Sequence, residues 1–108
     1  MFGFGVSSVP VVDPAQLADR LTQGERPCIV DVREPQETAA GHIPGAILIP
    51  LGSLSARLAE LPRDQQIVMV CRSGGRSASA TRAALDAGLD AVNMTGGMLA
   101  WAGEVVRP

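Results

Sequence analysis

The chain has 108 residues, 46% of them hydrophobic and 19% charged, with a formal net charge of −2 at pH 7. This length and composition are typical of a single globular domain. The charge does not favour nucleic-acid binding, and no apolar run approaches the roughly 20 residues of a membrane span, so we expect neither a nucleic-acid nor a membrane partner.

The first half of the chain predicts strands and helices in alternation. Residues 1–8 are expected to form a loose arm, followed by a short strand over residues 9–12. Asp13 is expected to cap a helix, because proline follows it and glutamine stands three residues later, and Gly24 is expected to end that helix. The next expected elements are a buried strand over residues 28–32, a helical turn from Glu34 to Gly41, a turn over residues 43–45 and a strand over residues 46–49.

The second half continues the same alternation. Ser53 is expected to cap a helix that ends at Pro62, because leucines at positions 54, 58 and 61 share one face. The remaining expected elements are a buried strand over residues 67–71, an alanine-rich helix over 77–87, a strand over 91–94 and a short helix over 97–101. This order with short connections indicates an α/β domain over residues 9–108, with a mostly parallel central sheet flanked by helices on both faces.

The cysteines indicate neither a disulfide scaffold nor a metal site. Cys28 and Cys71 lie far apart in the sequence, and with His42 as the single histidine they give no metal-ligand spacing. We therefore expect no metal, no cofactor and a reducing compartment. Residues 1–6 lack the basic and long apolar regions of a signal peptide, so a cytoplasmic location is expected, and the small size favours a monomer or a weak dimer.

The segment after the strand over residues 67–71 is the strongest candidate for a functional site. Cys71 ends that strand and is followed by a glycine-rich turn and a helix start. Backbone N–H groups of such a turn converge on one point, and the helix N-terminus adds partial positive charge. These features favour the thiolate and lower the pKa of a cysteine, which is about 8.5 when free. We expect Cys71 to be the nucleophile and the anion-binding residues to be Arg72, Ser73, Gly74, Gly75, Arg76 and Ser77.

The spacing between Cys71 and Arg76 indicates which reaction this loop favours. Four residues separate Cys71 from Arg76, whereas cysteine phosphatases have one more residue there, which widens the loop to the size of phosphate. The tighter loop favours a cysteine that carries one extra sulfur. The hydroxyls of Ser73 and Ser77 suit a hydrogen bond to sulfur and a helix cap equally well. Asp31 and Arg33, at the carboxyl end of a neighbouring strand, are interpreted as a second layer that braces the loop.

Three blocks of the sequence resemble the single-domain rhodaneses, the rhodanese-like sulfurtransferase family. The residues just before Gly41 depart from the family, which often has a bulky aromatic where Thr38-Ala39-Ala40 stands, and the tail after Trp101 is also short. Neither departure affects the loop. The blocks are Asp31-Val32-Arg33-Glu34 with Glu37 and Gly41-His42-Ile43-Pro44-Gly45-Ala46, running into Ile49-Pro50; then Cys71 to Ser77; then Gly96-Gly97 with Ala100-Trp101.

The resemblance implies a two-step sulfur transfer. Cys71 would take the outer sulfur of a small anionic donor such as thiosulfate, which Arg72 and Arg76 would attract, and would pass it from a persulfide to a cyanide or thiol acceptor. Basic loops of this kind go with thiosulfate in the family. Two alternatives stay open: a persulfide carrier or binding module that serves a partner in a sulfur relay, and, disfavoured by the spacing, a small cysteine phosphatase or arsenate reductase.

Overall fold

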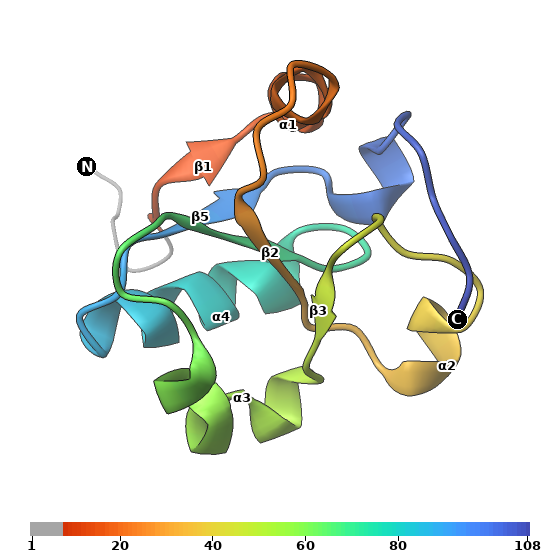
Figure 1. The fold of residues 1–108 in the computed structure, drawn as a ribbon. Coiled ribbons are helices and arrows are strands. Elements are labelled where there is room, and N and C mark those ends of the chain that lie inside the picture. Colours follow the sequence, from red (N-terminus) through yellow and green to blue (C-terminus); the bar gives the residue numbers. More distant parts are fainter. Residues whose placement is uncertain (1–7) are drawn as a thin grey trace.

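The sheet at the centre of the fold is wholly parallel (Figure 1). The computed structural model describes residues 8–108, so the arm expected over residues 1–8 lies outside the described residues apart from Ser8. Within the described range the strand order is β1-β5-β4-β2-β3, which confirms the expected parallel α/β sheet. The strands are β1 (Val11–Val12), β2 (Cys28–Asp31), β3 (Ile47–Leu48), β4 (Ile67–Val70) and β5 (Ala91–Met94).

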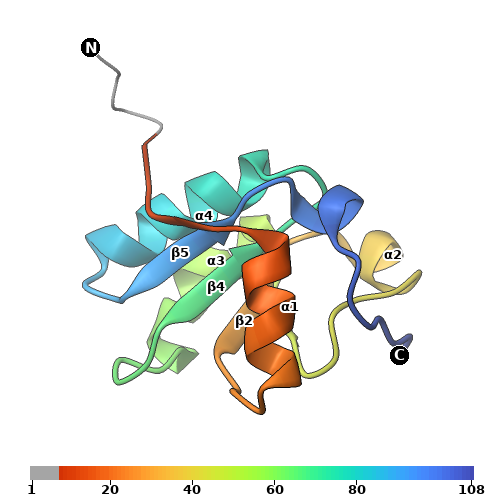
Figure 2. The ribbon, with the colours of Figure 1, turned by 90° about the horizontal axis from the view of Figure 1, so that it is seen from above.

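Helices cover both faces of this sheet, as the sequence predicts. Figure 2 shows α1 lying across one face, with α3 and α4 behind the other. Asp13 caps α1 in the expected capping box with Gln16, and Gly24 beyond its end has a φ of +91°. The helical elements are α1 (Pro14–Thr22), α2 (Pro35–Thr38), α3 (Leu51–Arg57), α4 (Gly75–Asp86) and the 3-10 turns η2 (Leu58–Glu60) and η3 (Gly97–Ala100).

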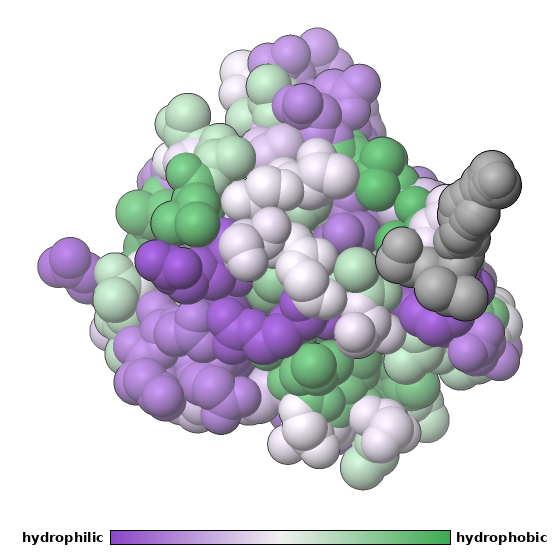
Figure 3. Space-filling view, turned by 180° about the vertical axis from the view of Figure 1, so that it is seen from behind, coloured by the Kyte–Doolittle hydropathy of each residue, from purple (hydrophilic) through white to green (hydrophobic). Residues whose placement is uncertain are grey.

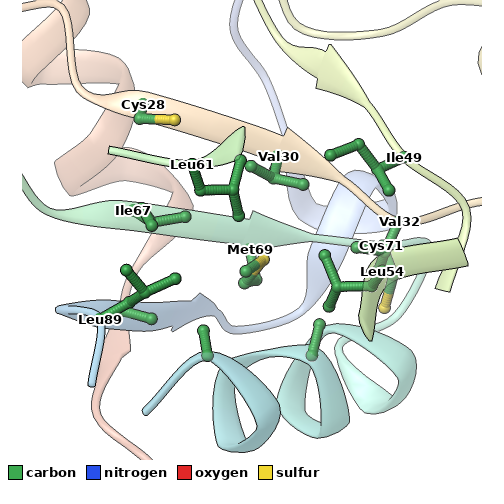
Figure 4. Close-up of a cluster of buried hydrophobic side chains, with 13 residues drawn as sticks. Cys28, Val30, Val32, Ile49, Leu54, Leu61, Ile67, Met69, Cys71 and Leu89 are labelled. Carbon is green, nitrogen blue, oxygen red and sulfur yellow. The ribbon is translucent and has the colours of Figure 1, made fainter. Parts of the chain in front are cut away.

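Alternation along β4 decides which side of the sheet Cys71 faces. Val68 and Val70 pack in the core on the α1 side, whereas Ile67, Met69 and Cys71 pack in the core on the α3 and α4 side. Because side chains of a strand alternate between faces, the register of β4 places the Cys71 side chain toward α4. Figure 4 shows it at the end of that cluster, beside Leu54 and Val32.

The parallel register also brings three loops to one edge of the sheet. Asp31 at the end of β2 pairs with Val70 at the end of β4, and the Val32 N–H continues the ladder to the Val70 carbonyl at 2.9 Å. Strand β5 pairs with β4 on its other side. The segments that follow β2, β4 and β5 therefore start side by side, at the edge where parallel sheets bind ligands.

Two helix starts differ from the sequence prediction. The prediction of a Ser53 cap is wrong, because α3 begins at Leu51 with Pro50 at the N-cap position. Backbone bonds to β2 and the residue after it, from Ile49 N to Asp31 O and from Leu51 N to Val32 O (both 3.0 Å), carry the chain directly into that helix. The helix expected from residue 77 begins two residues earlier, at Gly75, after Gly74 with a φ of +109°.

The surface view in Figure 3, from behind Figure 1, shows hydrophobic patches separated by hydrophilic side chains. Exposed large hydrophobic residues among residues 8–108 include Val11 on the edge strand and Leu99 on η3. None of the helices in the described part of the chain has the length and apolar character to cross a membrane.

Candidate active site around Cys71

The Cys71 sulfur is buried but surrounded by hydrogen-bond donors. The residue is 1% exposed. Its Sγ atom accepts the Gly74 N–H at 3.0 Å and lies 3.2 Å from the Ser77 Oγ. Gly74 and Ser77 stand at the N-terminal end of α4, so the sulfur also lies where the helix dipole favours negative charge. The sulfur therefore occupies the polar end of an otherwise apolar cluster.

Two opposing effects set the acidity of Cys71. Burial raises the pKa of the thiol, but hydrogen bonds from the Ser77 hydroxyl and from the backbone N–H groups of Ser77, Gly74 and Ser73 lower it, and the net result is a pKa below the ordinary value. Hydrogen bonds lower the pKa because they stabilise the charged form. The loop thus compensates a buried thiolate through its own backbone, as the sequence predicts for a reactive cysteine.

Strand β5 contributes a residue that the sequence analysis did not single out, Asn93. Its Nδ2 donates to the Gly74 carbonyl at 3.2 Å, and its Oδ1 accepts from the Ser77 hydroxyl at 2.6 Å. Asn93 is 6% exposed, and Ser77 is fully buried. The signal in the sequence is a single amide side chain within the apolar run Ala91-Val92-Asn93-Met94. A buried polar side chain needs partners, and here these partners belong to the Cys71 loop.

The 3-10 turn η3 holds the other side of the loop. Met98 N donates to the Cys71 carbonyl at 2.8 Å, and Leu99 N donates to the Arg72 carbonyl at 3.0 Å. Gly97, with a φ of +58°, packs so closely against these two residues that a Cβ atom would overlap both carbonyl groups. The glycine pair at 96–97 therefore has a physical role: it allows the backbone of η3 to reach the loop.

The two arginines of the loop differ in their partners. Arg76 forms a bidentate ion pair with Glu37 of α2, with distances of 2.6 and 2.8 Å. The hydrogen bond from Arg76 is the main reason that the pKa of the Glu37 carboxyl falls to about 2, and Glu37 in turn raises the pKa of Arg76. Arg72 is exposed, and no ion pair connects it to another residue in the range 8–108. Arg72 is thus the free cation of the loop.

Asp31 and Arg33 form a buried ion pair one step away from the loop. Arg33 Nη2 lies 2.8 Å from Asp31 Oδ2 and also donates to the Gly41 carbonyl at 2.8 Å. The side-chain bonds of this pair within the described residues go to each other and to Gly41, not to residues 71–77. Any support for the loop passes through the segment 34–41, which carries Glu37.

The remaining candidates have simpler environments. Ser73 is exposed and contributes its N–H to the sulfur, and Gly75 is the first residue of α4. His42 forms a backbone bridge with Val106, just before the turn at residues 44–45. Among residues 8–108 no cluster of three or more histidine, cysteine, aspartate or glutamate side chains could hold a metal.

A pocket of about 410 Å³ lies away from Cys71. Its lining comes from α1, the turn at 44–45 and the C-terminal segment, and it includes Leu21, Arg26, Pro44, Trp101 and Glu104. Trp101 and Leu21 pack against the core on the α1 side of the sheet, whereas Cys71 belongs to the opposite core. This pocket and the Cys71 sulfur therefore lie on opposite sides of the sheet.

Comparison with known proteins gives consistent matches over most of the chain. Residues 13–104 match the family described as "Rhodanese-like domain". A protein from Allochromatium vinosum named "Sulfurtransferase" is 39% identical over 92 residues, which cover 84% of this chain and 86% of that protein. "Putative sulfur carrier protein YrkF" from Bacillus subtilis is 36% identical over 99 residues, which cover 91% of this chain and 54% of that protein. The crystal structure of a rhodanese-like domain protein from Staphylococcus aureus has a TM-score of 0.87 at 35% identity and covers 93% of this chain and 99% of that one.

The close approach at Gly97 generates the first prediction. The substitution Gly97→Ala is expected to lower the free energy of unfolding by about 2 kcal/mol or more, since a positive φ alone costs an L-residue roughly 1–2 kcal/mol and the new methyl overlaps the loop carbonyls. Urea unfolding measures the change. Gly52→Ala is the matched control, because its Cβ would meet no atom within 4 Å, and alanine in a helix is favoured by roughly 0.5–1 kcal/mol. Equal stability of the two variants would contradict the close approach.

The second prediction concerns acid stability. Because the pKa of Glu37 is lowered on folding to about 2 from an ordinary value of about 4.3, the ion pair contributes stability that is complete above pH 4.3 and lost as the pH falls to 2. Glu37→Gln should therefore be less stable at neutral pH, by less than about 1 kcal/mol for a partly exposed pair, and this difference should disappear near pH 2. Thermal unfolding at a series of pH values measures it. Glu60→Gln, which breaks the more exposed pair with Arg57, should change the curve less.

Proposed function

We propose that this chain, which belongs to the rhodanese-like domain family, transfers sulfane sulfur from a small anionic donor such as thiosulfate to a cyanide or thiol acceptor through a persulfide on Cys71. Sulfurtransferase activity is the activity of the family. The observation that carries the finer proposal is the set of N–H and O–H donors around the Cys71 sulfur, which lowers its pKa despite burial. A thiolate is the form of cysteine that attacks sulfur.

The first step loads the cysteine. The Cys71 thiolate attacks the outer sulfur of thiosulfate, and a new S–S bond forms as the bond between the two thiosulfate sulfurs breaks. Sulfite leaves with that electron pair, and the negative charge of the attacking thiolate passes to the outer sulfur of the persulfide. Arg72, as the exposed and unpaired cation within residues 8–108, attracts the donor, while Arg76 keeps its place against Glu37.

The second step unloads the cysteine. A cyanide ion or an acceptor thiolate attacks the outer sulfur of the persulfide, and Cys71 leaves again as a thiolate. The same N–H groups that stabilise the resting thiolate stabilise this leaving group, so no separate acid is needed. His42 has no role in this scheme, which agrees with its backbone bridge to Val106.

A second candidate function is a sulfur carrier that accepts persulfide sulfur from a partner protein. One observation favours it: a relative matched over 91% of this chain is named "Putative sulfur carrier protein". Both candidates use the same persulfide and differ in turnover on free donors.

The persulfide itself gives the third prediction. After treatment with thiosulfate, intact-mass spectrometry should show the mass of one added sulfur atom, and cyanide should remove it. Cys71→Ser should abolish this gain, because a serine hydroxyl forms no persulfide, while circular dichroism confirms that the variant is folded. Cys28→Ser is the matched control and should load as the parent protein does, since Cys28 lies in the core at the start of β2. Loading that follows Cys28 rather than Cys71 would overturn the proposal.

The fourth prediction separates the enzyme from the carrier. In a thiosulfate:cyanide assay an enzyme turns over repeatedly, whereas a carrier holds a persulfide but shows little turnover on free thiosulfate and cyanide. If the enzyme proposal holds, Arg72→Ala should lower kcat/KM for thiosulfate about tenfold or more, as expected for loss of a charge-assisted hydrogen bond. Arg82→Ala is the control, since Arg82 is an exposed arginine farther along α4. An equal loss in both variants would argue against a specific role of Arg72.

A further inference from the structure

The Ser77 hydroxyl lies between two acceptors that compete for its single proton. Its Oγ atom is 3.2 Å from Cys71 Sγ and 2.6 Å from Asn93 Oδ1. A serine hydroxyl has one hydrogen to donate, so a bond to one acceptor weakens the bond to the other. Both distances suit a hydrogen bond to their acceptor, so the amide oxygen competes with the sulfur for the proton. Because Ser77 is fully buried, water does not reach this point and cannot donate a hydrogen bond to whichever acceptor Ser77 leaves.

The Asn93 amide is fixed with its oxygen toward Ser77. Its Nδ2 donates to the Gly74 carbonyl at 3.2 Å, and a reversed amide would place two oxygens against each other at that point. The residue lies within β5, where it pairs with Val11 on one side and Met69 on the other. The neighbouring strands fix the backbone of Asn93, and the bond from its Nδ2 to the Gly74 carbonyl holds its oxygen toward the hydroxyl.

We propose that Asn93 is a positioning residue that competes with the Cys71 sulfur for the Ser77 proton, weakens the hydrogen bond that Ser77 donates to the thiolate, and so keeps the free thiolate more reactive toward sulfur donors. The role in sulfur transfer rests on the function proposed above. Asn93 forms no hydrogen bond with the sulfur. It acts on the sulfur through the Ser77 hydroxyl, while its bond to the Gly74 carbonyl holds the turn that directs the Gly74 N–H at the sulfur.

The three states of the cysteine differ in how they use this proton. In the thiol state, Cys71 S–H donates to Ser77 Oγ, and Ser77 O–H donates to Asn93 Oδ1, so each group has a partner. In the thiolate state, a Ser77 proton that turned to the sulfur would leave a buried amide oxygen without a donor, which is costly. In the persulfide state, the charge has moved to the outer sulfur, and Ser77 again donates to Asn93.

This arrangement disfavours the free thiolate of Cys71 relative to the thiol and to the persulfide. The backbone N–H groups of the loop still stabilise the thiolate, but Ser77 adds less than it would beside an apolar residue. A thiolate of higher pKa is the better nucleophile toward sulfur, so Asn93 favours loading. The charged groups near this edge of the sheet are unchanged by a substitution at position 93; they are Arg72, Arg76, Glu37, Asp31 and Arg33.

The fifth prediction tests this proposal by a double-mutant cycle in the Cys28→Ser background, so that Cys71 is the single thiol. The thiolate pKa is measured from ultraviolet absorbance against pH. Asn93→Ala should lower it by about one unit, because the Ser77 proton becomes free to stabilise the charged sulfur. The loading rate per thiolate should fall about threefold for that shift. In a Ser77→Ala background the same Asn93 substitution should not lower the pKa, because no Ser77 proton remains to turn to the sulfur and only the Asn93 bond to the Gly74 carbonyl is lost.

Asn93→Val provides a second variant that fills the site with a strand-favouring apolar side chain, and thermal unfolding confirms that each variant is folded. It should lower the pKa in the same direction as Asn93→Ala. An unchanged or raised pKa in both variants, or an equal shift in the Ser77→Ala background, would overturn the proposal. Thiolate titration requires no sulfur donor, so failure of the parent protein to load sulfur would count against the proposed function and not against this proton arrangement.

Discussion

The structure around the candidate site depends on one constraint: several backbone N–H groups must point at a single buried sulfur. Gly74 makes this possible, because its φ of +109° turns the chain so that its own N–H and the first turn of α4 face Cys71. A residue with a side chain adopts this conformation with difficulty. The other contacts of the site preserve this turn: Asn93 holds the Gly74 carbonyl, and η3 holds the carbonyls of Cys71 and Arg72.

Burial and hydrogen bonding act in opposite directions on that sulfur, and their balance is what gives the site its chemistry. A cysteine at the end of β4 with only apolar neighbours would have a raised pKa, as burial raises that of Cys28. Both cysteines belong to the same core cluster. They differ because Cys71 stands at the carboxyl edge of the sheet, beside a helix N-terminus, whereas Cys28 stands at the start of β2. Position in the parallel sheet therefore separates a reactive thiol from a structural one.

Structural elements could be predicted from the sequence where the contacts that determine them lie close together in the chain. Hydrophobic runs predict the buried strands, capping residues predict the capping box at Asp13, and glycine placement predicts the loop at Cys71. In each case the residues that determine the feature lie within a few positions of it in the sequence. The contacts that were not predicted join residues far apart: Asn93 of β5 to Ser77 of α4, and Glu37 of α2 to Arg76 of α4. They depend on strand register and on where α2 packs. The Ser53 cap failed for the same reason, since backbone bonds to Asp31 and Val32 set the start of α3.

The charges of the site explain why one loop suits both an enzyme and a carrier. Glu37 offsets Arg76, so Arg72 and the α4 N-terminus remain to balance one negative charge on the sulfur. A thiolate and a persulfide anion each carry one such charge, and loading therefore leaves the net charge of the site unchanged. Under the proposed chemistry the ionic interactions of the site are therefore the same before and after loading, so gain and release of sulfur require only small changes in the surrounding structure. The difference between turnover and carriage then depends on access to a cysteine that is 1% exposed, and access is a property of loop motion and of the partner rather than of the charges.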